Sequence, residues 1–299
     1  ERYQSDGIRI LVALMSLILL FYLIGQLVSG LVMFQLMLGL GKSSALIITT
    51  LVLLFYVVMG GAHADILSDG IQGGMMLILA IIVVFITLNG VGLEGGLSGL
   101  IRELRDQDPL LTDIFNSESS LFSSWWSVIV IGFAHIPLGL LPHLGNKIWA
   151  LKSPNDRATF IWMAASFGLT LSLMGIGGFL ARAHFGEDLL TGSGNPNQAL
   201  PLLFIEIFPS WLAALIGIGI LSAVMSTADG LVISSSQIIA NDLYRKTYIP
   251  KRAINLSESQ IDRNVLNISR LSTILILILC AFFAQSLINK NVALIVWIG

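Results

Sequence analysis

Long apolar stretches separated by short charged segments set the pattern along this chain. A helix of roughly twenty apolar residues crosses the hydrocarbon core of a membrane. The candidate spans are residues Gly7–Leu40, Ser44–Gly60, Ile66–Asn89, Ser123–Leu141, Thr159–Ala183, Ser210–Ala240 and Leu266–Leu287. Another apolar run begins near Asn291. The pattern predicts an all-α membrane protein with about seven full transmembrane helices and the start of an eighth.

The positions of lysine and arginine predict how these helices are oriented. Cytoplasmic loops of membrane proteins are enriched in both residues. With the N-terminus in the cytoplasm, the inner set is Arg2, Arg9, Lys147, Lys152, Arg157, Arg245, Lys246, Lys251, Arg252, Arg263 and Arg270, and the outer set is Lys42, Arg102, Arg105, Arg182 and Lys290. The bias toward the inside predicts a multi-pass protein of a plasma membrane, such as a bacterial inner membrane, with lipid around its helices.

The two ends of the sequence bear on its organisation. The beginning, ERYQSDGIRI, is charged and leads directly into a span, and the end, NVALIVWIG, lies within an apolar run. We therefore expect an internal fragment of a longer transporter, with residues 1–299 forming a single transmembrane domain.

Composition narrows the possible functions. Hydrophobic residues make up 55% of the chain and charged residues 11%, whereas soluble domains carry about 25% charged residues. The net charge of −2 gives no reason to expect a nucleic-acid partner. Cys280 is the only cysteine and forms no internal disulfide. Because we find no nucleophile–base set, no zinc-ligand spacing and no phosphate loop, we expect neither an enzyme nor an organic cofactor.

The segment ILSAVMSTADGLVISSSQIIANDLYRK carries many oxygen atoms for a membrane helix. At about 100° per residue, one stripe holds Ser222, Ser226, Asp229 and Ser236, the neighbouring stripe holds Ala223, Thr227, Gly230 and Ser234, and only Ser235 points away. This half of the helix is expected to face protein or water. Small residues and hydroxyls also serve helix packing, which remains an alternative for the serines. A midspan aspartate costs about 2.5–3.5 kcal/mol on insertion scales and indicates function.

Hydroxyls and free carbonyls are hard ligands that suit a hard cation. They do not neutralise a divalent ion, which would need several carboxylates. A monovalent ion such as Na⁺ fits Ser226 and Thr227 better. Transporters bind such ions near the membrane midplane, at loosened helix segments.

A second polar segment, MGGAHADILSDGIQGGMM, follows the second candidate span. The pair Gly60–Gly61 is expected to break one helix, and Asp65 or Ser68 to cap the next. Asp69 then lies about one turn into a span, with Gln72 three residues later in a position to orient it. Either Asp69 serves an ion, or it is a first-turn carboxylate that the helix dipole favours.

The span Ser123–Leu141 and the residues after it contain several helix breakers, namely Gly132, Pro137, Gly139 and Pro142. Proline removes an amide donor, and such breaks are tolerated in a membrane where the freed carbonyls line a cavity. A span interrupted by glycine and proline points to a transporter's binding site. His135 and His143 flank the break, and a packing role is favoured over a ligand role for both.

These segments resemble conserved stretches of one family. GGAHADILSDGIQG resembles GG-x-x-A-x-x-x-[ST]-D-x-[IV]-Q of the sodium:solute symporter family, and SAVMSTADGLVISSSQIIANDLY resembles its signature AA-x-MST-x-x-x-x-L-x-x-SS-x-x-x-x-DLY. PHLGNKIWALKS is similar to the stretch after the family's broken helix. The likeness covers nearly the whole chain and is greater to the proline, pantothenate and monocarboxylate branches than to the sugar branch.

The resemblance implies a LeuT-type core of two inverted repeats, of which this chain would contain core helices three to nine and the start of ten. It implies a sodium site formed by the carbonyl of Ala223 and the hydroxyls of Ser226 and Thr227. It implicates Asp69 in a second sodium site or the inner ion path, to which we add Asp229 and Gln72. The implied substrate cavity comprises Ala134, His135, Pro137, Leu138 and Gly139.

The resulting prediction is Na⁺-coupled symport of a small organic solute by alternating access. Two alternatives keep the fold: a receptor that senses a solute and signals through a partner, and a proton-coupled carrier that uses Asp69 or Asp229. A proton-translocating subunit of a respiratory complex is disfavoured, because such subunits need midspan lysines and glutamates and the spans contain none.

Overall fold

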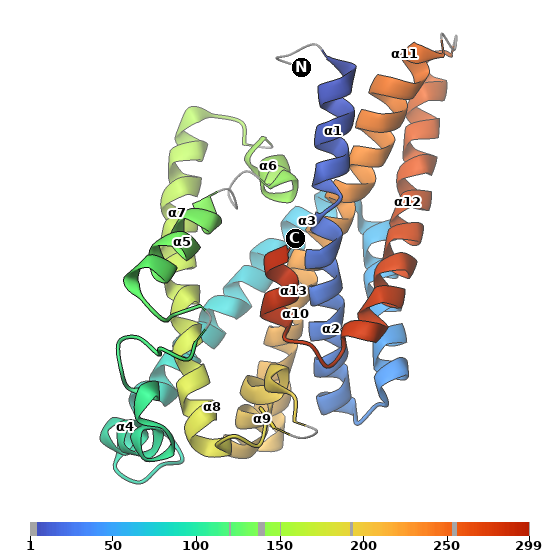
Figure 1. Cartoon of the computed structure of the whole chain (residues 1–299). Helices are drawn as coiled ribbons and strands as arrows, with labels where there is room; N and C mark the ends of the chain where they lie inside the picture. The colour runs from blue at the N-terminus through green and yellow to red at the C-terminus, as the bar shows by residue number, and fades with distance from the viewer. Residues whose placement is uncertain are drawn as a thin grey trace. The chain divides into compact units, whose positions relative to one another are not determined.

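The computed structural model describes residues 5–119, 121–136, 141–149, 151–191, 194–252 and 256–298, and within these ranges it contains helices and no strand (Figure 1). The α-helices are α1 Asp6–Ser16, α2 Leu19–Leu38, α3 Lys42–Leu88, α4 Gly96–Gln107, α5 Trp125–His135, α6 Pro142–Trp149, α7 Pro154–Ser172, α8 Gly177–Phe185, α9 Ala199–Ile207, α10 Ser210–Gln237, α11 Ile249–Lys251, α12 Glu258–Leu287 and α13 Val292–Ile298. The 3₁₀ turns are η1 Pro109–Leu111, η3 Leu173–Ile176 and η4 Pro196–Gln198, and the segment η5 Ile238–Tyr248 is a π-helix. The predicted all-α class is confirmed.

Six helical stretches of the described residues are long and apolar enough to cross a membrane: Asp6–Leu38, Lys42–Gly60, Asp65–Leu88, Pro154–Phe185, Ser210–Lys251 and Glu258–Leu287. They correspond to six of the seven predicted spans. The seventh, Ser123–Leu141, appears as the 11-residue helix α5, which is too short to span alone. Residues 137–140 of that span lie outside the described residues, so its full length stays a prediction.

Helix α3 corrects the prediction that the paired glycines end a helix. It is helical from Lys42 to Leu88 without interruption, so neither Asp65 nor Ser68 is an N-cap. The hydroxyls of Tyr56 and Ser68 nevertheless touch, although twelve residues of a straight helix would separate them by about 18 Å along the axis. The helix therefore bends sharply between these residues while keeping its helical pattern.

The chain divides into two compact units. The first unit comprises Glu1–Gln72 and Leu221–Gly299. The side chains of Leu27 and Leu31 on α2 and of Leu231 on α10 are fully buried there. Glycines bring its helices close together, because a Cβ at Gly25 would lie 2.7 Å from the side chain of Val296 on α13.

The second unit comprises Gly73–Ile220. Its core contains Val83 of α3 and Leu180 of α8, together with Phe204 of α9. Helix α4 turns Leu100 and Leu104 into this core. These contacts explain why α4 is ordered although it is polar along most of its surface.

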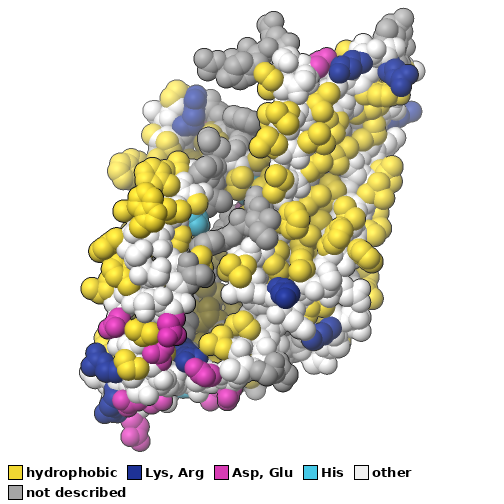
Figure 2. Space-filling model, in the orientation of Figure 1, with side chains coloured by type: hydrophobic (Ala, Val, Ile, Leu, Met, Phe, Trp, Pro, Cys, Tyr) yellow, Lys and Arg dark blue, Asp and Glu magenta, His cyan; other side chains and the backbone are white. Residues whose placement is uncertain are grey.

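Exposed hydrophobic side chains are common along the long helices (Figure 2). Leu11 and Met15 of α1 and Leu275 and Phe282 of α12 are each more than half exposed. Arg245 of η5 forms ion pairs with Glu258 and Asp262 of α12, at the end of α12 that is predicted to face the cytoplasm. This distribution is the one that a lipid environment favours.

Candidate functional site

A hydrogen bond joins the two polar segments that the sequence singled out. The Ser226 hydroxyl on α10 donates to Oδ1 of Asp69 on α3 at 2.6 Å, across 157 residues of sequence. Both residues belong to the first unit. The contact is short for a hydrogen bond between two side-chain oxygens, and it fixes the registry of α3 against α10 at this level.

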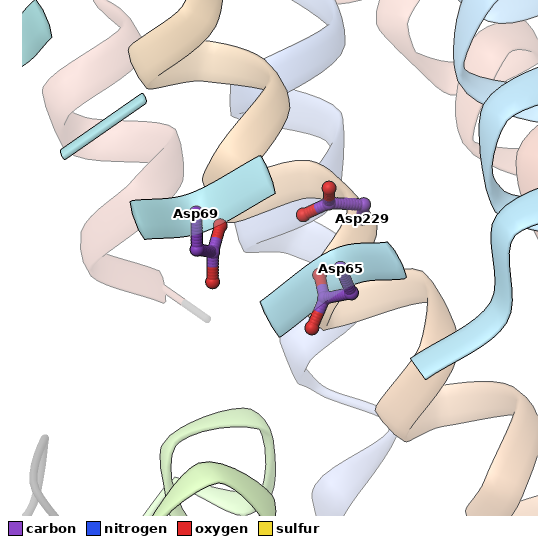
Figure 3. A group of neighbouring side chains, drawn as sticks. All are labelled: Asp65, Asp69 and Asp229. Atoms are coloured by element: carbon purple, nitrogen blue, oxygen red, sulfur yellow. The ribbon is translucent and has the colours of Figure 1, made fainter. Parts of the chain in front are cut away.

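Two further aspartates lie beside this contact. Asp65 is one turn before Asp69 on α3, and Asp229 is one turn after Ser226 on α10. One carboxylate oxygen from each of Asp65, Asp69 and Asp229 lies within 4.8 Å of the other two. Figure 3 shows the three side chains around a shared space, with Asp65 and Asp69 on one ribbon and Asp229 on the other. We call this group the carboxylate cluster.

Asp229 is the most deeply buried member of the cluster, with 0% of its surface exposed. Its Oδ1 accepts the backbone N–H of Gly230 at 2.7 Å. Its Oδ2 is buried and has no hydrogen-bond partner among the described residues. A buried charged oxygen without a partner is costly, and whether Asp229 serves an ion stays a prediction.

The three predicted sodium ligands occupy one turn of α10, immediately before Asp229. The Thr227 hydroxyl donates to the carbonyl of Ala223 at 3.4 Å, and the Ser226 hydroxyl donates to the Asp69 carboxylate. A hydroxyl that donates its hydrogen still offers oxygen lone pairs, so both side chains fit the requirement for a hard cation. The ligand assignment itself stays a prediction.

The serines that follow on α10 have a packing role. Ser234, Ser235 and Ser236 are each 2% exposed or less, and the Ser236 hydroxyl bonds the Ile233 carbonyl and receives the hydroxyl of Ser269 on α12. Ser235, which the helical wheel turns away from the other oxygens, is buried as well. Residues 228–236 are buried on all sides, because this part of α10 is enclosed by other helices.

Asp65 is the functional candidate that sequence reasoning missed. It was expected to cap a helix, because the preceding glycines suggested a helix start. In a continuous helix, residues four apart share a face, so the spacing of Asp65 and Asp69 was the available signal. Gln72 lies three residues after Asp69, and its Oε1 is buried without a partner among the described residues, which leaves its predicted role untested.

The predicted substrate cavity lies in the second unit. Ala134 and His135 are exposed on α5, and His135 Nδ1 lies 2.7 Å from the Ile131 carbonyl of its own helix. Pro137, Leu138 and Gly139 lie outside the described residues. The cavity therefore stays a prediction.

Comparison with known protein families identifies the family of this chain. The profile of the sodium:solute symporter family matches residues 1–298. The chain belongs to the sodium:solute symporter family. The resemblance carried by the two motifs is thereby confirmed, and the family and its known relatives are transporters rather than enzymes.

Known relatives of this symporter-family chain include bacterial transporters. It is 27% identical over 278 residues to a sodium/pantothenate symporter of Haemophilus influenzae, covering 92% of this chain and 53% of that protein. It is 27% identical over 291 residues to the high-affinity proline transporter PutP of Bacillus subtilis, covering 93% and 56%. The chain spans about half the length of the curated relatives it matches.

A solved structure confirms the fold. The chain is similar to a Na⁺-coupled sialic acid symporter in a substrate-bound outward-open state, with a TM-score of 0.69 and 21% sequence identity, covering 94% of this chain and 60% of that one. The symporter-family chain thus has a LeuT-like helical fold and is a multi-pass plasma-membrane protein, as its six apolar helices also indicate.

Proposed function

We propose that the protein to which this chain belongs is a Na⁺-coupled symporter of a small organic solute. The Ser226–Asp69 hydrogen bond is the observation that carries this proposal. This bond places the Asp69 carboxylate next to the Ser226 hydroxyl, which the family resemblance assigns to the sodium site. A negative charge beside that site increases the attraction of the site for a cation. Family membership and the names of the relatives support the same reading.

The ion path begins at the turn of Ala223, Ser226 and Thr227. Sodium bound there meets one carbonyl and two hydroxyl oxygens of α10. Asp69 holds the Ser226 hydroxyl in place and, with Asp229, forms a second ion position or the route toward the cytoplasm. Sodium thus stabilises one packing of α3 against α10, and this differential affinity is what shifts the conformational equilibrium.

The driving force is sufficient for concentrative uptake. For a solute without net charge, such as zwitterionic proline, one positive charge that moves through 100 mV releases about 2.3 kcal/mol, which sustains roughly a fifty-fold solute gradient per ion. The coupling is reciprocal, because a solute whose affinity rises with sodium must raise the affinity for sodium by the same factor.

The proposed solute is a small carboxylate-bearing molecule of the pantothenate and proline type. Two relatives named for these solutes align with more than nine-tenths of this chain. Both molecules have a carboxylate attached to a compact polar body. The positive charge of bound sodium would favour such a solute over a neutral sugar.

Solute counterflow into vesicles containing the full-length protein tests the proposal. Labelled proline, pantothenate, lactate and glucose are compared in NaCl and in choline chloride at fixed pH. We expect accumulation of one carboxylate-bearing solute in NaCl alone. Equal counterflow in choline, or uptake driven by a pH gradient without sodium, would refute sodium coupling and favour the proton-coupled carrier.

A further inference from the structure

Helix α12 of the first unit carries two exposed arginines at the end that is predicted to face the cytoplasm. Arg263 and Arg270 lie seven residues apart on this helix. Seven residues are close to two helical turns, so both side chains leave the helix on the same side, with their Cα atoms about 10 Å apart along the axis. Leu266 and Asn267 lie between them on that side and are exposed as well.

Another face of this part of α12 packs against η5. The side-chain amide of Asn264 donates to the Tyr244 hydroxyl at 3.1 Å. The guanidinium of Arg245 pairs with Glu258 and with Asp262, each at 3.0 Å. Glu258 and Asp262 are the acidic residues of α12, so the carboxylates of this helix already face a cation of η5.

The two exposed arginines have no such partners. Arg263 and Arg270 form neither an ion pair nor a hydrogen bond with the part of the chain that the structure describes. Arg9 of α1, by contrast, pairs with Asp6 at 2.8 Å. Because a guanidinium is always charged and offers five donors, the two free arginines are available to an anion from outside the chain.

The outward side of α12 continues from these arginines into an apolar surface. The side chains of Leu271 and Phe282 are each more than half exposed. No charged residue occurs in the run 271–288, which is about 27 Å of helix and close to the roughly 30 Å of a hydrocarbon core. The inner boundary of the hydrocarbon therefore falls near Arg270, and Arg263 lies beyond it, at the depth of the lipid headgroups.

A lipid phosphate is the anion that is found at this depth. Arginine donates two parallel N–H bonds to phosphate oxygens. Side chains of a helix tilt toward its N-terminus, which carries the guanidinium of Arg270 away from the hydrocarbon and toward Arg263. A zwitterionic headgroup brings its own cation to the phosphate, whereas an anionic headgroup leaves that charge free. Charge complementarity thus favours an anionic lipid.

We propose that Arg263 and Arg270 bind the headgroup of an anionic phospholipid in the cytoplasmic leaflet, with the phosphate between the two guanidinium groups. The acyl chains then lie along the exposed apolar side chains of α12, including Leu271 and Phe282. Such binding requires neither sodium nor a transported solute, so the lipid site stands apart from the proposed symport.

Native mass spectrometry of the full-length protein in detergent tests the site by measuring the affinity for the first bound lipid. Dioleoylphosphatidylglycerol is compared with dioleoylphosphatidylcholine, which has the same acyl chains, and we expect the anionic lipid to bind more tightly. Two basic residues near an anionic lipid together correspond to roughly a thirtyfold change in affinity. The double variant Arg263→Gln with Arg270→Gln should lose about that factor for phosphatidylglycerol, and each single variant about fivefold.

The matched control is Arg252→Gln. Arg252 is an exposed arginine at the same end of the first unit, and its guanidinium lies 5.8 Å from the centre of the Tyr248 ring. This variant should keep its affinity for phosphatidylglycerol within about twofold, because it leaves both proposed ligands in place. An equal loss in Arg252→Gln would overturn the site, since it would report the general surface charge.

Three other results would overturn the site. The first is equal affinity of the unaltered protein for the two lipids, a comparison that needs no variant and is also the result expected if another protein segment covers this face. The second is unchanged phosphatidylglycerol binding by the double variant. The third is displacement of phosphatidylglycerol by soluble glycerol 3-phosphate, which would show a site for a free phosphate instead of a lipid.

Discussion

Replacing Ser226 with alanine perturbs the contact on which the proposed sodium site depends most. The substitution removes one hydroxyl ligand and the donor of the 2.6 Å bond to Asp69. A hydrogen bond to a charged group contributes about 1.5–3 kcal/mol, and about 1.4 kcal/mol is a tenfold change in affinity. We therefore expect the apparent sodium affinity of Ser226→Ala to fall by roughly ten- to a hundredfold.

Sodium titration of purified full-length protein measures this loss, with the midpoint of thermal unfolding recorded at each concentration. The matched control is Ser235→Ala, because Ser235 lies on the same helix and its buried hydroxyl has no hydrogen-bond partner among the described residues. Asp69→Asn completes a double-mutant cycle with Ser226→Ala. If both residues act through one contact, the double variant should lose much less affinity than the two single losses added together.

The reasoning is refuted if Ser226→Ala binds sodium within twofold of the unaltered protein. It is also refuted if Ser235→Ala loses as much affinity as Ser226→Ala, since a loss common to both serines reports damaged packing of α10. Additive losses in the cycle would separate Ser226 from Asp69 and remove the argument that the carboxylate orients the hydroxyl.

Three further predictions concern packing, capping and thiol access. Gly30→Ala places a Cβ 2.6 Å from the side chain of Thr49, and the variant should lose about 1–3 kcal/mol of stability, measured as a lower midpoint of thermal unfolding. The control Gly73→Ala places its Cβ where no atom lies within 4 Å, so it should not lower the midpoint. Equal midpoints for the two variants would contradict the close approach of α2 and α3. Ser153→Ala removes the side-chain cap of α7 and should cost about 0.5–2 kcal/mol by the same assay; an unchanged midpoint would show that the cap contributes nothing. Cys280 is 1% exposed and should resist a water-soluble maleimide until the protein is unfolded, so rapid labelling of the folded protein would contradict its burial.

The membrane spans were predictable because apolar length is a local property of the sequence. The sequence also pointed to Ser226, Thr227 and Asp69 as candidate site residues, because polar side chains in apolar membrane helices are costly and usually have a function. That Asp69 meets Ser226 could not be derived from either segment alone, because the hydrogen bond joins residues far apart in sequence.

Two errors have a common physical origin. Asp65 was given a capping role because glycine pairs favour helix ends, yet α3 bends and remains helical. The half of α10 that carries most of the oxygens was expected to face protein or water, with Ser235 on the other half, yet this part of α10 is enclosed on all sides. In both cases tertiary packing decided the outcome against a local rule.

The most direct test of the account is parallel uptake of ²²Na⁺ and labelled solute by vesicles that contain the full-length protein. The account predicts that the two fluxes rise together and that Thr227→Ala lowers both by at least tenfold, while Ser235→Ala leaves both unchanged. Solute uptake that continues at the full rate without a sodium flux, or a Thr227→Ala protein that carries both at the original rate, would contradict it.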